Sequence, residues 1–369
     1  MSARDSAKNG SIVPIASFRW IGVLLLSAAA GLPAAAQSGA EPGYLFNDSH
    51  FHLTNYVQQG TDVHDYLAIM GDKVGRSTLF GIPLQQTWSH ENSGDFAPTY
   101  YLQTDAPLYY YSFTDAWIAT AYKSLSKQDQ ARFDPMITGF NPTDMYAADH
   151  IRRVLKAFPG VFTGIGEFSI HKEFVSAKIA GEVASLQDQA LDRLLDFATE
   201  VGLVVLIHND VDVPFAKPGV EPAYAAQMKA LFRRHPNTTF IWAHIGVGRI
   251  IRPIKDQAAI VEEIINDPKL SNVHFDISWD EVAKYIVATP ESTKHAAEMV
   301  NRYPNRFLFG TDEVAPADQD KYLKVYNQYE PFWKLLTPEA GEKVRKKNYE
   351  RIFDEARRKV RSWEAAHVK

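Results

Sequence analysis

Short runs of apolar and β-branched residues recur along the chain and alternate with segments of helical periodicity. Eight such runs predict strands, at residues 44–52, 77–85, 133–141, 161–170, 203–210, 238–246, 272–278 and 306–313. Between them, three segments carry apolar residues at three-to-four spacing and end at Gly or Pro, which predicts helices at 145–159, 185–202 and 222–236. Strand alternating with helix eight times indicates an α/β fold of the (β/α)8 TIM-barrel type, with an open doubly wound sheet as the alternative.

The longest segment between predicted strands, residues 86–132, is rich in aromatic side chains. It contains Trp88, His90, Tyr100, Tyr101, Tyr109, Tyr110, Tyr111 and Trp117. In a barrel this long loop after strand 2 leaves the working face, so we expect a lid or pocket wall for an apolar or aromatic substrate, with Trp88 as a substrate contact. The alternative is a loop that packs on the barrel rim around a small core of its own.

Composition changes this picture mainly at the N-terminus. The chain of 369 residues is 46% hydrophobic and has a formal net charge of −5, so it offers a large core and no basic surplus that would indicate nucleic acid. Basic residues precede an apolar stretch that ends in small residues, which predicts a secretory signal peptide over residues 1–36. Residues 37–369 are then one barrel domain, periplasmic or secreted. An uncleaved membrane anchor is the alternative.

Side chains that bind metals fall at the predicted C-terminal ends of the strands, which form the working face of such a barrel. His50 and His52 stand two apart on the first strand and therefore project to the same side. The later strands contribute Glu167, His208, His244, Asp276 and Asp312. A barrel would direct these residues towards a common centre.

These residues suit a divalent metal ion. Three imidazole nitrogens and one carboxylate, a donor set that Zn²⁺ accepts with a position left for water, would come from His50, His52, His208 and Asp312. Metal binding lowers the pKa of such a water, so hydrolysis needs neither an activated serine nor a cysteine, and the chain has no cysteine. Asp312 would also serve as the catalytic general base. His244 would bind a second ion or polarise the substrate carbonyl.

The ordered motifs resemble those of the amidohydrolase superfamily of metal-dependent hydrolases, in particular the amidohydrolase-related branch that includes lactonases and decarboxylases. The motifs are H-x-H at 50–52, GIGE at 164–167, IHND at 207–210, AHIG at 243–246 and LFGTD at 308–312. The resemblance covers almost the whole chain after the signal peptide and implies a (β/α)8 barrel. It also implies metal ligation by His50, His52, His208 and Asp312, with His244 as a ligand of a second metal or as a catalytic histidine.

The number of metal ions stays open at the fourth strand. Many members of the superfamily with two metals carry a carboxylated lysine there, whereas this chain has Glu167, which would ligate or bridge metals. We expect one or two ions, with Zn²⁺ favoured and Mn²⁺, iron or cobalt as alternatives, because nitrogen and oxygen ligands accept all of them.

Substrate contacts are expected in the loops after these strands. Arg249 and Arg252 follow His244, and their guanidinium groups would match an anionic group of the substrate. The alternative is that both are surface arginines paired with acids. After the fourth strand, His171 and its neighbour Lys172 would contact substrate.

Some neighbouring polar residues are expected to support the ligands rather than to bind metal. Asp48 precedes the H-x-H motif, and Asn209 and Asp210 follow His208, so each would orient a histidine by accepting its other ring N–H. Asp276, on the seventh strand, is expected to have such a supporting role or a purely structural one.

Together these residues predict a metal-dependent hydrolase that uses water to cleave a lactone, amide or ester bond of a small molecule. The alternatives are a metal-dependent non-oxidative decarboxylase or other lyase on the same residues, and a secreted barrel without catalysis. We expect a small-molecule substrate, no nucleic-acid partner and no membrane anchor after signal cleavage. The substrate, the native metal and the formation of a homo-oligomer stay open.

Overall fold

The computed structural model describes residues 43–54, 60–82, 86–87, 111–173, 176–177, 184–217 and 219–368. The predicted signal peptide, the domain start at residue 37, and Trp88 with most of the aromatic segment lie outside these residues. Within the described ranges, no helix combines the length and the apolar character needed to cross a membrane.

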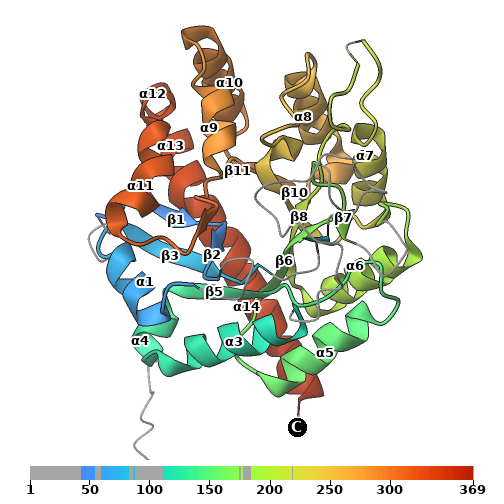
Figure 1. The fold of residues 1–369 in the computed structure, drawn as a ribbon, viewed down its shortest axis with the longest axis vertical. Helices are drawn as coiled ribbons and strands as arrows, with labels where there is room; N and C mark the ends of the chain where they lie inside the picture. Colours follow the sequence, from blue (N-terminus) through green and yellow to red (C-terminus); the bar gives the residue numbers. More distant parts are fainter. Residues whose placement is uncertain are drawn as a thin grey trace, which may run out of the picture. The chain divides into compact units, whose positions relative to one another are not determined.

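The eight predicted strands are present and form one sheet with parallel pairing throughout, in the order β1-β3-β5-β6-β8-β9-β10-β11 (Figure 1). They are β1 (Phe46–Asp48), β3 (Val74–Leu79), β5 (Phe133–Ile137), β6 (Gly164–Ser169), β8 (Val204–His208), β9 (Thr239–Trp242), β10 (Val273–Asp276) and β11 (Phe307–Leu308). The second of them begins earlier than the pattern predicted, because the buried Val74 already pairs with Phe46 of β1.

Short continuations of the first and last strands bring the two edges of the sheet together. β2 (Phe51–His52) pairs in parallel with β12 (Glu313–Val314). Just before β12, the Asp312 N–H donates a hydrogen bond of 2.8 Å to the His50 carbonyl. The first strand therefore lies beside the eighth, as a closed TIM barrel requires and an open doubly wound sheet does not.

Helices connect the strands and surround them (Figure 1). The three predicted helices are α5 (Ala147–Ala157), α6 (Gln189–Val201) and α7 (Ala225–Arg234). The others are α1 (Val63–Met70), α3 (Tyr111–Ser124), α4 (Lys127–Gln130), α8 (Gln257–Asn266), α9 (Asp280–Ile286), α10 (Pro290–Arg302), α11 (Gln319–Gln328), α12 (Glu330–Trp333), α13 (Pro338–Glu342) and α14 (Asn348–His367). The short elements are β4 (Gln86–Thr87), β7 (Ser176–Ala177), η1 (Ala243–Gly246), η2 (Pro268–Leu270) and η3 (Lys343–Lys347).

Helix α6 illustrates why these segments are helical. Its buried residues Leu191, Leu194, Leu195 and Ala198 follow a three-to-four spacing, so they form one apolar face against the sheet. The helix ends at Gly202, whose φ of 84° lies in the left-handed region that glycine adopts without strain.

The long helix α14 fills one end of the barrel interior. Its side chains Tyr349, Ile352, Phe353 and Ala356 form a single apolar cluster with inward-facing strand residues such as Leu206. Burial of one such large side chain contributes roughly 2–3 kcal/mol. The predicted ligands lie at the opposite end, where the strands terminate.

The described part of the aromatic segment is helical. Residues 111–132 form α3 and α4, and Ile118 and Ala119 of α3 belong to the main hydrophobic core of the barrel. Trp117, on the outer side of α3, is 51% exposed. This part of the predicted loop is therefore helical, and residues of α3 pack on the barrel core.

Candidate metal centre

Six predicted ligands converge at the C-terminal ends of the strands. They form two groups whose ligand atoms lie within 4.8 Å of one another, and a further such group joins His50 and His244 to Asp276. The first group is His50, His52, Glu167 and Asp312, and the second is Glu167, His208 and His244. His208, predicted to share an ion with the H-x-H motif, lies instead with Glu167 and His244. Glu167 belongs to both groups.

In the first group the distances between ligand atoms suit one bound ion. His50 Nε2 and His52 Nε2 each lie 3.1 Å from Asp312 Oδ1 and 3.7 Å from Glu167 Oε2. Two ligand atoms on the same tetrahedral Zn²⁺ are about 3.4 Å apart, because each lies about 2.1 Å from the ion. Four donors at this spacing would surround a single cation.

The other oxygens of Glu167 and Asp312 face the histidines of the second group. His208 Nδ1 lies 2.7 Å from Glu167 Oε1, and His244 Nε2 lies 3.6 Å from that oxygen and 3.8 Å from Asp312 Oδ2. Each carboxylate therefore offers one oxygen to each group. This arrangement can hold two ions with Glu167 between them.

Residues at the end of β10 hydrogen-bond the outer ring nitrogens of two of the imidazoles, His50 and His244. The His50 Nδ1–H donates to Asp276 Oδ2 at 2.7 Å, since a carboxylate only accepts. The Ser278 hydroxyl donates to the same oxygen at 2.7 Å and accepts from His244 Nδ1 at 3.0 Å. Asp276 and Ser278 thus set the tautomer and the ring orientation of one histidine in each group.

The other two imidazoles have their own outer partners. His52 Nδ1 donates to the Gly81 carbonyl at 3.4 Å, and His208 Nε2 lies 3.1 Å from Asp210 Oδ1. The predicted role of Asp210 in orienting His208 agrees with this contact.

The prediction that Asp48 orients a metal histidine through its ring is wrong. Asp48 Oδ1 accepts the backbone N–H groups of His50 and Thr311, at 3.0 and 2.9 Å, and Oδ2 accepts the Tyr322 hydroxyl at 2.8 Å. Burial raises the pKa of Asp48 to about 6, against the effect of these hydrogen bonds. Asp48 instead joins the backbone that carries His50 to the turn before Asp312, and Asp276 has the orienting role.

The inner ring nitrogens of His50 and His244 indicate whether these residues fit a metal ion. Both Nε2 atoms are buried and have no hydrogen-bond partner within the described part of the chain. Because each ring can donate its Nδ1 proton outwards, a neutral ring would turn a lone pair towards the oxygens of Glu167 and Asp312. Lone pairs and carboxylates repel unless a positive charge lies between them, so the residues present fit a divalent cation.

The pKa values of His50 and Asp312 show that positive charge is favoured beside these carboxylates. Burial alone would lower the pKa of His50, but Asp312 and Asp276 raise it well above its ordinary value. Burial would raise the pKa of Asp312, but the His50 and His244 rings hold it well below its usual range. Burial lowers the pKa of His244, which favours the neutral ring that a metal ligand needs.

Several residues around this centre have backbone conformations that are rare for their side chains. Asp312 (φ 53°), His244 (φ 55°), Glu173 (φ 53°) and Trp279 (φ 80°) all lie in the left-handed region. A bulky residue with positive φ is strained, and such strain is concentrated at functional sites. Their position in loops that follow the strands agrees with a functional centre at this face.

The predicted substrate contacts differ in their distance from the centre. Arg249 Nε donates to Glu281 Oε1 at 3.1 Å, as the surface-pairing alternative stated, although its guanidinium also lies over the ring of Trp279 at 5.5 Å. Arg252 is exposed. The His171 ring stacks on Tyr224 at 3.9 Å, and burial lowers its pKa to about 4.

Ser278 and Trp279 were missed at the sequence level. Ser278 contacts His244, and the Trp279 ring lies 5.0 Å from the His244 ring. The available signal was their position directly after the seventh predicted strand, where a barrel places its working residues. Their side-chain type gave no signal, because neither serine nor tryptophan is a usual metal ligand.

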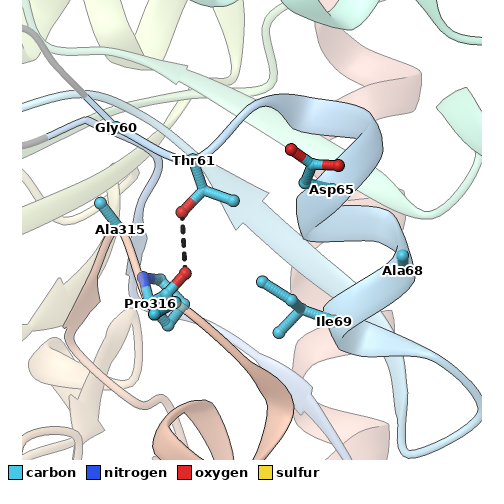
Figure 2. A pocket seen from close by; sticks show the side chains of 8 residues that line it. Gly60, Thr61, Asp65, Ala68, Ile69, Ala315 and Pro316 are labelled. Atoms are coloured by element: carbon cyan, nitrogen blue, oxygen red, sulfur yellow. Dashed lines mark hydrogen bonds between the residues drawn. The ribbon is translucent and has the colours of Figure 1, made fainter.

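A hollow of about 590 Å³ lies beside the ends of the first and last strands (Figure 2). It is lined by Gly60, Thr61, Asp65, Ala68, Ile69, Ala315, Pro316 and Ala317. The Thr61 hydroxyl crosses it to donate to the Pro316 carbonyl at 2.9 Å. It contains none of the predicted ligands, so we assign it no part in the chemistry.

Comparison with known proteins agrees with this architecture. The sequence model of a family described as amidohydrolase matches residues 48–354. No functionally curated protein matches the sequence.

Among solved structures, the fold is similar to that of a TIM-barrel protein of unknown function from Bordetella bronchiseptica, with 14% identity, 84% of this chain and 99% of that chain covered, and a TM-score of 0.50. A protein from Pseudomonas putida assigned as a 2-pyrone-4,6-dicarboxylic acid hydrolase has 13% identity, coverage of 85% and 98%, and a TM-score of 0.50. A 2,6-dihydroxybenzoate decarboxylase has 13% identity, coverage of 84% and 99%, and a TM-score of 0.51. At these identities the likeness concerns the fold.

Proposed function

Since the chain belongs to the amidohydrolase family and is an enzyme of that type, we propose that it is a metal-dependent hydrolase that cleaves a lactone, amide or ester bond of a small molecule with water. One observation carries this proposal. The four imidazoles have outer partners and turn their remaining nitrogens towards two shared carboxylates.

We assign two divalent ions, of which Zn²⁺ suits the donor set best. One would be held by His50, His52 and Asp312, the other by His208 and His244, with Glu167 shared by both. When bound, the ions supply polarisation of the substrate carbonyl and a water molecule of lowered pKa.

The side chains of the centre then have distinct roles. Asp312 is ionised at neutral pH because its pKa is held low, so it can accept a proton from the attacking water and return it to the leaving group. His244 is fully buried and hydrogen-bonded through Nδ1, so its inner nitrogen serves as a ligand rather than as a proton donor.

Metal analysis of the purified protein tests the assignment of the two groups. The wild-type protein should contain about two equivalents of a divalent ion, and His52→Ala and His208→Ala should each lose about one. Asp312→Asn should lose metal and hydrolysis together. His64→Ala, which changes an exposed histidine on α1, is the matched control and should keep both ions. A wild-type protein that takes up no metal on reconstitution would refute the proposal.

The reaction type is tested with labelled water once a substrate is turned over. Hydrolysis incorporates one atom of ¹⁸O from solvent into the product acid, whereas the alternative decarboxylase or lyase on the same residues releases its product without that atom. Carbon dioxide release without ¹⁸O incorporation would replace the hydrolase assignment by the alternative.

We also propose that residues 1–36 direct export and are removed, which places the enzyme in the periplasm or outside the cell. Mass spectrometry of the exported protein should show a mature chain that begins at about residue 37. An intact N-terminus on exported protein would contradict cleavage.

A further inference from the structure

The loop that follows β6 contains a buried acidic residue, Glu173, that the proposed function does not use. Glu173 is only 7% exposed, and its φ of 53° lies in the left-handed region. A residue other than glycine persists in that region only where the surrounding contacts hold it. The contacts of Glu173 are therefore a guide to its role.

The backbone of Glu173 holds the carboxylate that orients His208. The Glu173 N–H donates to Asp210 Oδ2, and the other oxygen of that carboxylate, Oδ1, lies 3.1 Å from His208 Nε2. Two backbone hydrogen bonds lead up to this contact, from Ile170 N–H to the His208 carbonyl at 3.0 Å and from Asp210 N–H to the His171 carbonyl at 2.8 Å. The Asp210 carboxylate therefore cannot turn away from His208 without losing the Glu173 N–H.

The side chain of Glu173 reaches the loop that follows His244. Its Oε1 accepts the Ile250 N–H at 3.0 Å. A Cβ at Gly248 would lie 3.2 Å from this oxygen, so the carboxyl group packs directly on the backbone of that loop. Because these contacts hold Glu173 in its positive φ, their loss would also release its N–H from Asp210.

The two contacts of Glu173 join the loops that follow all three ligands of the second group. Glu167 is on β6, His208 ends β8, and His244 lies in η1, directly after β9. Glu173 belongs to the loop after β6 and hydrogen-bonds one residue in each of the other two loops. Within the described ranges, its hydrogen bonds do not extend to the strands that carry the H-x-H motif and Asp312.

We propose that Glu173 is a positioning residue for the second ligand group, which fixes Asp210, and through it His208, relative to the loop that follows His244. This inference rests on the proposed function, because the ion of the second group is part of the assigned centre. It adds a residue that contacts none of the ligand side chains and yet controls the affinity of one ion alone.

Calorimetric titration of the metal-free, full-length protein with Zn²⁺ tests this role. In Glu173→Ala, the Kd of the ion in the second group should rise at least about tenfold, as when the outer partner of a metal histidine is lost. Glu173→Gln should bind both ions like wild type, since its amide oxygen can accept the Ile250 N–H. Burial raises the pKa of Glu173, and the nearby Asp210 carboxylate adds to this, so a neutral amide is a close substitute.

Histidine variants identify the ion that is affected. His52→Ala leaves the ion of the second group, so addition of Glu173→Ala should weaken that ion at least about tenfold. His208→Ala leaves the ion of the first group, so addition of Glu173→Ala should change its Kd by less than about twofold. A purely structural role of Glu173 would weaken the ion in both backgrounds.

Glu364→Ala is the matched control. Glu364 is 5% exposed and accepts the Gly160 N–H at 3.1 Å, which lies before the start of β6 rather than beyond its C-terminal end. Like Glu173→Ala, this variant should lose stability in urea unfolding, because a buried backbone N–H loses its acceptor. Unlike Glu173→Ala, it should keep both Zn²⁺ affinities.

The outcomes separate this inference from the proposed function. If wild type binds two ions but Glu173→Ala keeps the affinity of the second group, or loses both affinities equally, the inference is refuted and the metal-dependent hydrolase stands. A wild-type protein that binds one ion also refutes the inference and leaves a metal-activated water in place. If wild type binds no Zn²⁺, both proposals fail. A loss confined to the His52→Ala background and absent in Glu173→Gln establishes the positioning role.

Discussion

The hydrogen bond between His50 and Asp276 allows a sharp test of how the centre is organised. Asp276 is completely buried, and its Oδ2 accepts from His50 Nδ1 and from the Ser278 hydroxyl, both at 2.7 Å. Asp276→Asn keeps the size of the side chain but replaces one acceptor by an amide NH₂. If that NH₂ faces His50, two donors meet, and the ring relieves the conflict by moving its proton to Nε2. The nitrogen that should bind metal is then protonated.

The expected loss follows from the number of groups that depend on Asp276. Removal of the outer partner of a metal histidine weakens metal affinity by about 10–100-fold, equivalent to about 1.4–2.7 kcal/mol. Because Ser278 links Asp276 to His244 as well, both ligand groups are affected. We therefore expect a loss towards the upper end of this range, together with a lower free energy of unfolding of the metal-free protein.

The measurement is the metal Kd, obtained by competition with a chelating dye, after circular dichroism has shown that the variant is folded. Asp115→Asn is the matched control, because Asp115 is also buried but accepts hydrogen bonds from the backbone of Thr138 and Gly139 rather than from a candidate ligand. The control should lose stability but keep its metal affinity within about twofold. The reasoning is refuted if Asp276→Asn binds metal as tightly as wild type, or if Asp115→Asn loses as much.

Three further predictions concern two buried histidines and one glycine. Burial together with two nearby arginines lowers the pKa of His274 to about 3. The stability from its neutral ring is therefore complete above about pH 6.5 and is lost as the pH falls below that value. Metal-free wild-type protein should therefore lose about 2 kcal/mol more of its free energy of unfolding between pH 6.5 and 5 than metal-free His274→Gln, measured by urea unfolding. The same dependence of unfolding free energy on pH in both proteins would contradict this. The pKa of His50 is raised, so a metal ion must displace its proton. Metal affinity should therefore fall about tenfold per pH unit below that pKa, and calorimetry should detect proton release on metal binding. A metal affinity independent of pH would argue against this prediction. Gly166 has a φ of 114°, and a Cβ there would overlap the Leu206 carbonyl, so Gly166→Ala should cost at least about 2 kcal/mol by urea unfolding. Gly160→Ala is the control, since Gly160 also has positive φ but nothing within 4 Å of its Cβ position; equal losses in the two variants would contradict the clash.

The sequence alone was sufficient to predict the barrel and to name candidate ligands, because both depend on local patterns. Buried parallel strands appear as short apolar runs, and their C-terminal ends are recognised by the polar residue that follows. His50, His52, His208 and Asp312 could be named as candidate ligands for this reason. Helices α5, α6 and α7 were also predicted, because apolar residues at three-to-four spacing form one buried face of a helix.

The partners of those ligands were decided only by the tertiary structure. Asp276 reaches His50 across 226 positions of the chain, and Glu167 lies between two ligand groups contributed by other strands. Such contacts depend on strand register and barrel closure, which no local pattern encodes. For the same reason Asp48, two residues before His50, was assigned to the wrong neighbour. A local pattern tells which side chains face the centre, whereas the closed barrel determines which atoms meet there.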